Sequence, residues 1–311
     1  VDAKSLTDAF NKGETVIEAG TSCFLCHRIN KAANAGGNAD FTVNLKDRKE
    51  YFFDSSSKGA KNWLNNKSIN ANPDAHKASY TNKGLYQDSL YCATCHNEFI
   101  PGTGVKINDN YGEWLKSSFN NPKDPSKHRS CIDCHMNADI SKLGQKVPGY
   151  STVGGEFKDD VKTHHFTGAN YYLAGLKSAE HKKLSIDLLR IATELNASIK
   201  DDKLTIRVSN VMAGHNFPGG ARRQIWLEVT LKDKYGAVVF KNGHMNGDEK
   251  PKNAREFKKV AGKKDGSPVG LHFWRQERMI KDTRIPADGY RDEVYEIPSK
   301  LQYPLTIQTR L

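Results

Sequence analysis

Residues 90–99 read LYCATCHNEF, which places two cysteines three positions apart and a histidine directly after the second. The same Cys-x-x-Cys-His pattern occurs at residues 23–27 and 131–135. The three copies together contain all six cysteines of the 311-residue chain. A pattern that recurs and leaves no cysteine over indicates one repeated chemical task.

The Cys-x-x-Cys-His pattern is typical of c-type haem attachment. Two thiols add to the two vinyl groups of one haem, so they must lie a short, fixed distance apart. The histidine that follows then lies below the iron and supplies an axial nitrogen. The sequence therefore predicts three covalently bound haems c. The predicted attachment residues are Cys23, Cys26, Cys92, Cys95, Cys131 and Cys134, and the proximal ligands are His27, His96 and His135.

Other uses of paired cysteines fit less well. Structural zinc shares one ion between two Cys-x-x-Cys units, and three pairs do not divide into four-cysteine sites. Zinc also gives no reason for a histidine after every pair. A thioredoxin-like redox motif is expected once, near a βαβ pattern. Disulfides within each pair would close loops too short to contribute much stability.

The second axial ligand of each haem decides between electron transfer and substrate binding. Met136 directly follows His135 and cannot reach the opposite face of the same ring, so bis-histidine ligation is favoured. The candidates near the motifs are His76, His164 and His165, with His128 and His181 as open alternatives.

The charge pattern bears on partners and location. The formal net charge is +11, but lysines are dispersed among acidic residues, without the basic stripe and interleaved aromatics of a nucleic-acid binder. No run of about 18 apolar residues occurs, so no transmembrane helix is predicted. The first residues, VDAKSLTDAF, lack a methionine, which indicates a processed product. Because covalent haem attachment takes place outside the bacterial cytoplasmic membrane, a periplasmic or extracellular location is expected.

Three regions differ in their residue patterns. Residues 1–170 are rich in Asn, Gly, Ser and Lys and predict a triheme domain of loops and short helices. Because this stretch is so polar, it buries little apolar surface of its own. Packed haems would therefore form its core. Residues 171–199 carry apolar side chains at helical spacing, which predicts one long helix over roughly 173–198 that joins the two halves.

Residues 200–311 alternate apolar and polar side chains with a period of two. The stretches are KLTIRVSNV, RQIWLEVTLKD, KYGAVVF, RDEVYEIP and PLTIQTRL. They predict an antiparallel β-sandwich of about 110 residues. The predicted fold class of the whole chain is therefore α+β.

Several stretches resemble bacterial multihaem c-type cytochromes that carry a C-terminal β-sandwich domain. A Trp-x-x-Ser segment at 114–117 precedes the Cys-x-x-Cys-His-Met site at 131–136, and a His-x-Phe-x-Gly segment follows at 164–168. A Gly-His-x-x-Pro loop at 214–218 matches a loop at the start of the β domain in such relatives. The resemblance covers about residues 70–311. It departs after the proline of that loop, where relatives often carry Thr-Gly and this chain has Gly-Gly.

His215 lies in the Gly-His-x-x-Pro loop, in a half of the chain that has no cysteine. Two interpretations stay open. It is either a turn histidine bonded to its own backbone, or a ligand that reaches a haem iron and fastens the two halves together.

These features favour an electron-transfer protein, a carrier rather than a substrate-converting enzyme. Its partners would be other redox proteins that bind weakly and transiently as donor and acceptor. One alternative is an oxidoreductase of a small nitrogen or sulfur compound with one five-coordinate haem, although no Cys-x-x-Cys-Lys variant occurs. Another is a subunit that self-assembles into a conducting cytochrome filament, with the β-sandwich as a docking module.

Overall fold

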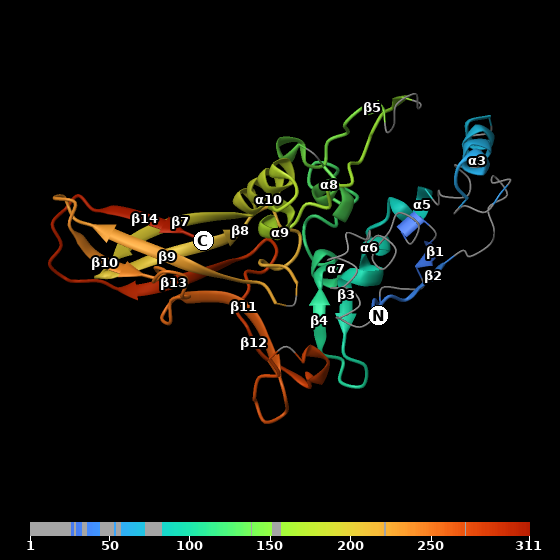
Figure 1. The fold of residues 1–311 in the computed structure, drawn as a ribbon. Helices are drawn as coiled ribbons and strands as arrows, with labels where there is room; N and C mark the ends of the chain where they lie inside the picture. The colour runs from blue at the N-terminus through green and yellow to red at the C-terminus, as the bar shows by residue number, and fades with distance from the viewer. Residues whose placement is uncertain are drawn as a thin grey trace. The chain divides into compact units, whose positions relative to one another are not determined.

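The computed structural model describes residues 26–27, 29–32, 36–43, 53, 57–71, 83–137, 139–150, 157–220, 222–270 and 272–311 (Figure 1). Two units are distinguished, Val1–Thr94 and Cys95–Leu311. The boundaries expected at residues 170 and 199 stay a prediction. No helix in the described part is long and apolar enough to cross a membrane.

The described part of the first unit buries few apolar side chains. Asn65 is 1% exposed, and its side-chain amide bonds both the N–H and the carbonyl of Phe53 at 2.9 and 3.2 Å. The buried apolar residues described in this unit are Ile29 and Ala93, which form little protein core. Its elements are β1 (Ile29–Ala32) and β2 (Phe41–Val43), which pair antiparallel, then α3 (Ala60–Ala71), α5 (Lys83–Tyr86) and the start of α6 (Ser89–His96).

The second unit begins with short elements that surround the third motif. They are β3 (Asn97–Phe99) and β4 (Lys106–Asp109), which form an antiparallel pair, then α7 (Asn110–Trp114), α8 (Cys131–His135), η2 (Ile140–Lys142), β5 (Gly149–Tyr150) and β6 (Phe157–Lys158). The longest connections between these elements are residues 115–130, before α8, and 159–170, after β6.

The single long helix predicted over 173–198 is wrong. The structure has α9 (Tyr171–Gly175) and α10 (Ala179–Ala192), separated by a short break. Ser178 causes the second start, because its side chain accepts a 3.0 Å hydrogen bond from the N–H of His181 and caps α10.

The end of that predicted helix is a strand, β7 (Thr193–Lys200). From Thr193 onward the apolar residues Leu195, Ala197 and Ile199 recur with a period of two, which suits a strand rather than a helix. All eight residues of β7 pair antiparallel with the next strand. Tertiary pairing therefore overrides the helical spacing of Leu195 with the residues before it.

The β region contains two antiparallel sheets, so the α+β class is confirmed. One has the order β13-β8-β7 and the other β10-β9-β11-β12, with β14 also paired to β9. The remaining bounds are β8 (Lys203–Asn210), β9 (Gln224–Lys232), β10 (Val238–Asn242), β11 (Arg255–Gly262), η3 (Phe273–Arg275), β12 (Arg278–Asp282), β13 (Tyr290–Glu296) and β14 (Thr306–Arg310).

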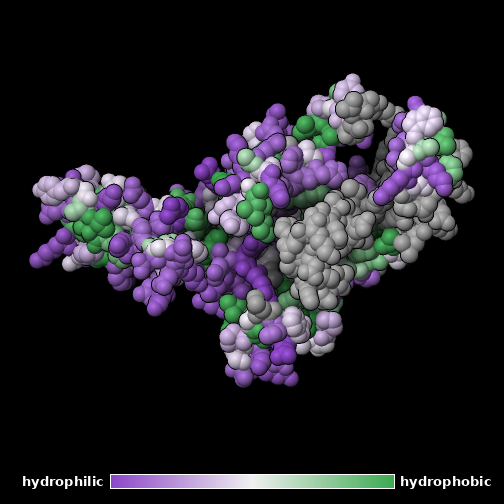
Figure 2. Space-filling model, in the orientation of Figure 1, coloured by the Kyte–Doolittle hydropathy of each residue, from purple (hydrophilic) through white to green (hydrophobic). Residues whose placement is uncertain are grey.

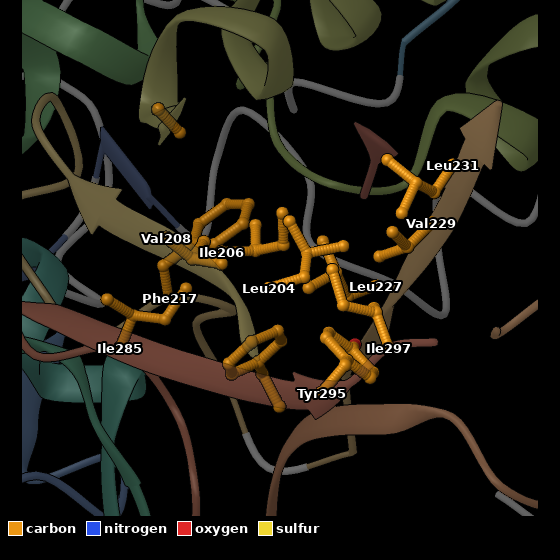
Figure 3. Close-up of a cluster of buried hydrophobic side chains, with 12 residues drawn as sticks. Leu204, Ile206, Val208, Phe217, Leu227, Val229, Leu231, Ile285, Tyr295 and Ile297 are labelled. Carbon is orange, nitrogen blue, oxygen red and sulfur yellow. The ribbon is translucent and has the colours of Figure 1, made fainter. Parts of the chain in front are cut away.

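Side chains from both sheets form one hydrophobic cluster (Figure 3). Alternate residues of β8 and of β9 point into it, and each fully buried aliphatic side chain contributes roughly 1.5–3 kcal/mol. The surface of the β region visible in Figure 2 is mostly hydrophilic. The central members of the cluster are Leu204, Ile206, Val208, Leu227, Val229, Leu231 and Phe257.

Candidate haem-binding centre

The third motif lies on helix α8, whose first turn is fixed by a capping box. Ser130 accepts a hydrogen bond from the N–H of Asp133, and the Asp133 carboxylate accepts from the N–H of Ser130 at 2.9 Å. Lys162 donates to the other oxygen of Asp133 at 2.9 Å. Residues three apart share a face of a helix, so Cys131 and Cys134 lie on one side of α8.

His135 is the last residue of α8, and one hydrogen bond determines which of its two ring nitrogens carries the proton. Its Nδ1 lies 2.5 Å from the carbonyl oxygen of Thr167, and since a carbonyl only accepts, Nδ1 carries the proton. The backbone repeats the contact, because the N–H of Thr167 donates to the carbonyl of His135 at 2.9 Å. The lone pair of Nε2 is thereby left for a metal, the arrangement seen in metal-binding histidines.

His215 lies in the loop between β8 and β9, which Asn210 holds in place. Asn210 is 3% exposed, and its Nδ2 donates to the carbonyl of His215 at 2.9 Å, while its Oδ1 accepts from the N–H of Ala213 at 3.0 Å. The Nδ1 of His215 donates to the carbonyl of Asn216 at 3.1 Å. The backbone bond expected of a turn histidine is therefore present, and it leaves the Nε2 of His215 as the acceptor.

Two glycines of this loop make room for aromatic rings. A Cβ on Gly214 would lie 2.9 Å from Cδ1 of Trp114, and one on Gly219 would lie 2.6 Å from Cε1 of His215. Trp114 in turn donates through Nε1 to the carbonyl of Arg129, just before α8, at 2.8 Å. The Trp-x-x-Ser and Gly-His-x-x-Pro segments thus pack together beside the third motif.

The rings of His135 and His215 lie parallel. Their planes differ by 6° and their centres are 6.3 Å apart. Consider two imidazoles that bind one metal from opposite sides. Each metal–nitrogen bond is about 2.0–2.1 Å, and each nitrogen lies roughly 1.15 Å from the centre of its ring, since ring bonds are near 1.35 Å. The two ring centres are then about 6.3–6.5 Å apart. The centre distance of the observed pair agrees with this range, and its ring planes are close to parallel.

The protonation states suit ligation as well. Burial is the main cause that lowers the pKa of His215 to about 4, and the nearby His135 acts in the same direction. Burial likewise lowers the pKa of His135, and the hydrogen bond to Thr167 opposes the shift only in part. Both imidazoles are therefore neutral at neutral pH, which is the form that binds metals. His96 of the second motif is close enough to act electrostatically on both rings.

The other two motifs are described in part. Helix α6 carries Cys92, Cys95 and His96 in the same helical arrangement as α8. In the first motif, the carbonyl of Cys26 accepts a 2.9 Å hydrogen bond from the hydroxyl of Tyr91, and the ring of His27 meets the edge of Tyr86. Cys23 and His76 lie outside the described residues.

The remaining candidate ligands contact other aromatic rings. The His165 ring meets His181 edge-on with centres 5.9 Å apart, and the His164 ring contacts Phe166. The Nδ1 atoms of His128 and His165 are buried without a hydrogen-bond partner among the described residues. Buried polar atoms are nearly always paired, so these two nitrogens are suited to a partner other than protein. The axial roles of all four histidines stay predictions.

Three residues of the site were not found from the sequence. Asn210 and Glu113 hydrogen-bond the backbone of the His215 loop, and Arg284 hydrogen-bonds Glu113. Glu113 and Arg284 both lie within residues 70–311, which the multihaem resemblance covers, but they are 171 positions apart. Only the folded chain shows that they meet.

Comparison with known proteins gives one clear likeness. No family model and no curated protein matches the chain. Among solved structures, the penta-heme cytochrome c552 from Thermochromatium tepidum is similar, with a TM-score of 0.54 and 18% identity, over 97% of this chain and 73% of that chain. The chain thus shares its fold with a multihaem c-type cytochrome.

Proposed function

We propose that this protein is an electron-transfer multihaem cytochrome c with three covalently bound haems. The observation that carries the proposal is the His135–His215 pair, with parallel rings, centres 6.3 Å apart and both Nε2 atoms left unprotonated by the Nδ1 hydrogen bonds. Two cysteines on the helix of His135 would attach the haem that these two rings ligate. The shared fold with a penta-heme cytochrome supports the same interpretation.

The division of roles at this centre follows from the residues. Cys131 and Cys134 would hold the porphyrin, and His135 and His215 would supply the two axial nitrogens. Haem c supplies a one-electron iron couple, for which the protein provides position and exclusion of water. An iron held by both histidines would have no open position for a substrate, which favours a carrier over an enzyme. The Nδ1 hydrogen bonds to Thr167 and Asn216 hold both rings, so little rearrangement would be needed when the charge of a bound iron changes.

We extend the proposal to the other two motifs. Cys23, Cys26 and His27 hold one haem, and Cys92, Cys95 and His96 hold another. Their distal ligands come from His76, His164 and His165. The two sheets form a β-sandwich, and the hydrophobic cluster that they share supports this part of the proposal. The partners are other redox proteins, and the location is periplasmic or extracellular, as covalent haem attachment requires.

The experiment is a spectroscopic comparison of His215→Ala with the unaltered protein. Intact mass and the pyridine haemochrome assay first count the haems, and three per chain is expected. Electron paramagnetic resonance should then show one haem of the variant changed from low-spin to high-spin. His244→Ala is the matched control, because His244 lies in the same β region but bonds Thr230 at 2.9 Å. Three low-spin haems in His215→Ala would refute ligation by His215.

A further inference from the structure

A buried ion pair lies beside the loop that carries His215. Arg284 donates to the Oε1 atom of Glu113 at 2.6 Å, and the two side chains are 2% and 10% exposed. Arg284 also donates to Asp282 at 2.8 Å. A buried pair of this kind loses its hydration, so it adds little stability compared with apolar side chains of the same size. The ion pair is therefore better explained by a role in positioning a neighbouring part of the chain.

The position that the pair controls is that of His215. The second oxygen of Glu113, Oε2, accepts a 3.0 Å hydrogen bond from the backbone N–H of Asn216, the residue directly after His215. Arg284 thus fixes one carboxylate oxygen, and the other fixes the loop. The N–H of Gly220 donates to Asn110, on the same helix as Glu113, at 3.2 Å.

Glu113 and Asn210 hold His215 from both sides along the backbone. Asn210 bonds the carbonyl of His215, and Glu113 bonds the next N–H. Glu113 belongs to α7, which ends at Trp114, and Trp114 bonds the segment that leads into α8 and His135. Helix α7 thereby links the position of the His215 ring to that of the His135 ring.

We infer that Glu113, itself held by Arg284, is a positioning residue that fixes His215 opposite His135. The inference rests on the proposed ligation of a haem by this pair. Glu113 touches neither ring, and it acts through the backbone of Asn216.

The test measures how readily the His215 ligand is displaced. Cyanide binding to the ferric protein reports the rate at which a distal histidine leaves its iron, and electron paramagnetic resonance reports the spin state. In Glu113→Ala the loop loses its acceptor, and the rate at one haem should rise about 10-fold or more, the usual effect of removing a group that orients a metal ligand. Glu113→Gln should give a smaller rise, because its single amide oxygen can accept from Arg284 or from the N–H of Asn216 but not from both.

The matched control is Glu228→Ala. Glu228 also pairs with an arginine, Arg310 at 2.8 Å, but on strand β9. Its cyanide-binding rate should equal that of the unaltered protein. A similar acceleration in Glu228→Ala would overturn the inference, since a general loss of stability would then explain the result.

The outcomes separate the inference from the proposed function. Unchanged cyanide binding in Glu113→Ala, with His215→Ala still producing one high-spin haem, would overturn the role of Glu113 alone. Three low-spin haems in His215→Ala would overturn both. If Glu113→Ala does not fold, Glu113→Gln decides: an accelerated rate in folded protein supports the inference, and an unchanged rate rejects it.

Discussion

Gly219 and His215 are so close that no side chain fits between them: a Cβ on Gly219 would lie 2.6 Å from Cε1 of the imidazole. Carbon atoms in contact normally stay about 3.5–4.0 Å apart, so one of the two must move. His215 is the movable one, because its ring turns about single bonds.

Gly219→Ala is therefore expected to tilt or displace the His215 ring without unfolding the sheets. Visible and electron paramagnetic resonance spectra should show altered signals, or a high-spin fraction, at one haem. Gly220→Ala is not a suitable control because Gly220 has a φ of +82°. Gly168→Ala is better, since nothing lies within 4 Å of its Cβ position. Identical spectra for both variants would contradict the prediction.

Asn210→Leu should destabilise the protein and loosen the same ligand. The variant leaves the carbonyl of His215 and the N–H of Ala213 without their partner, at a cost of about 1–3 kcal/mol for each buried group left unpaired. Urea unfolding measures the loss. Asn242→Leu, where the amide makes one exposed 3.3 Å bond, is the comparison and should change stability far less.

Ile206→Ala should separate stability from haem ligation. Ile206 is fully buried in the cluster between the two sheets, so removing its side chain should lower the free energy of unfolding by about 2–5 kcal/mol. The haem spectrum below the unfolding transition should stay that of the unaltered protein. A change of spin state in the folded variant would show that the cluster also controls His215.

The pair Arg207–Asp292 predicts a pH dependence of stability. The hydrogen bonds from Arg207, at 2.8 and 2.7 Å, lower the pKa of Asp292 below its ordinary value. A carboxylate whose folded-state pKa is lowered stabilises the fold above its unfolded-state pKa, near 3.9, and that stabilisation is lost as the pH falls through the folded-state pKa.

Asp292→Asn should remove this part of the acid dependence. The melting temperature of the unaltered protein should fall more steeply below about pH 4 than that of the variant, and the two curves should run parallel above it. Equal steepness in both would show that the pair contributes nothing, as many exposed ion pairs do.

Local patterns in the sequence predicted the motifs and most strands of the β region. The alternation in KLTIRVSNV and RQIWLEVTLKD became β8 and β9, whose buried residues form the cluster. Strand β12 was missed because all five of its residues are exposed and show no apolar alternation. Strand β7 was taken for helix because Leu195 continues the helical spacing of α10.

The site was only partly predictable for a different reason. His135 and His215 each follow from a short motif, and His215 was one of the expected ligands. Their pairing depends on Asn210, Glu113 and Arg284, which act over contacts as distant as 171 positions. A single sequence contains no local signal for such contacts, since each residue type is common on protein surfaces as well.

The parallel pair has a consequence for how the chain matures. His135 and His215 are 80 positions apart, so one iron bound by both would cross-link the chain as a disulfide does and restrict the unfolded state. A haem attached at residues 131–134 would gain its sixth ligand only once β8 and β9 have brought their connecting loop into place. The spin state of that iron would then show whether the cysteine-free half, residues 200–311, has folded.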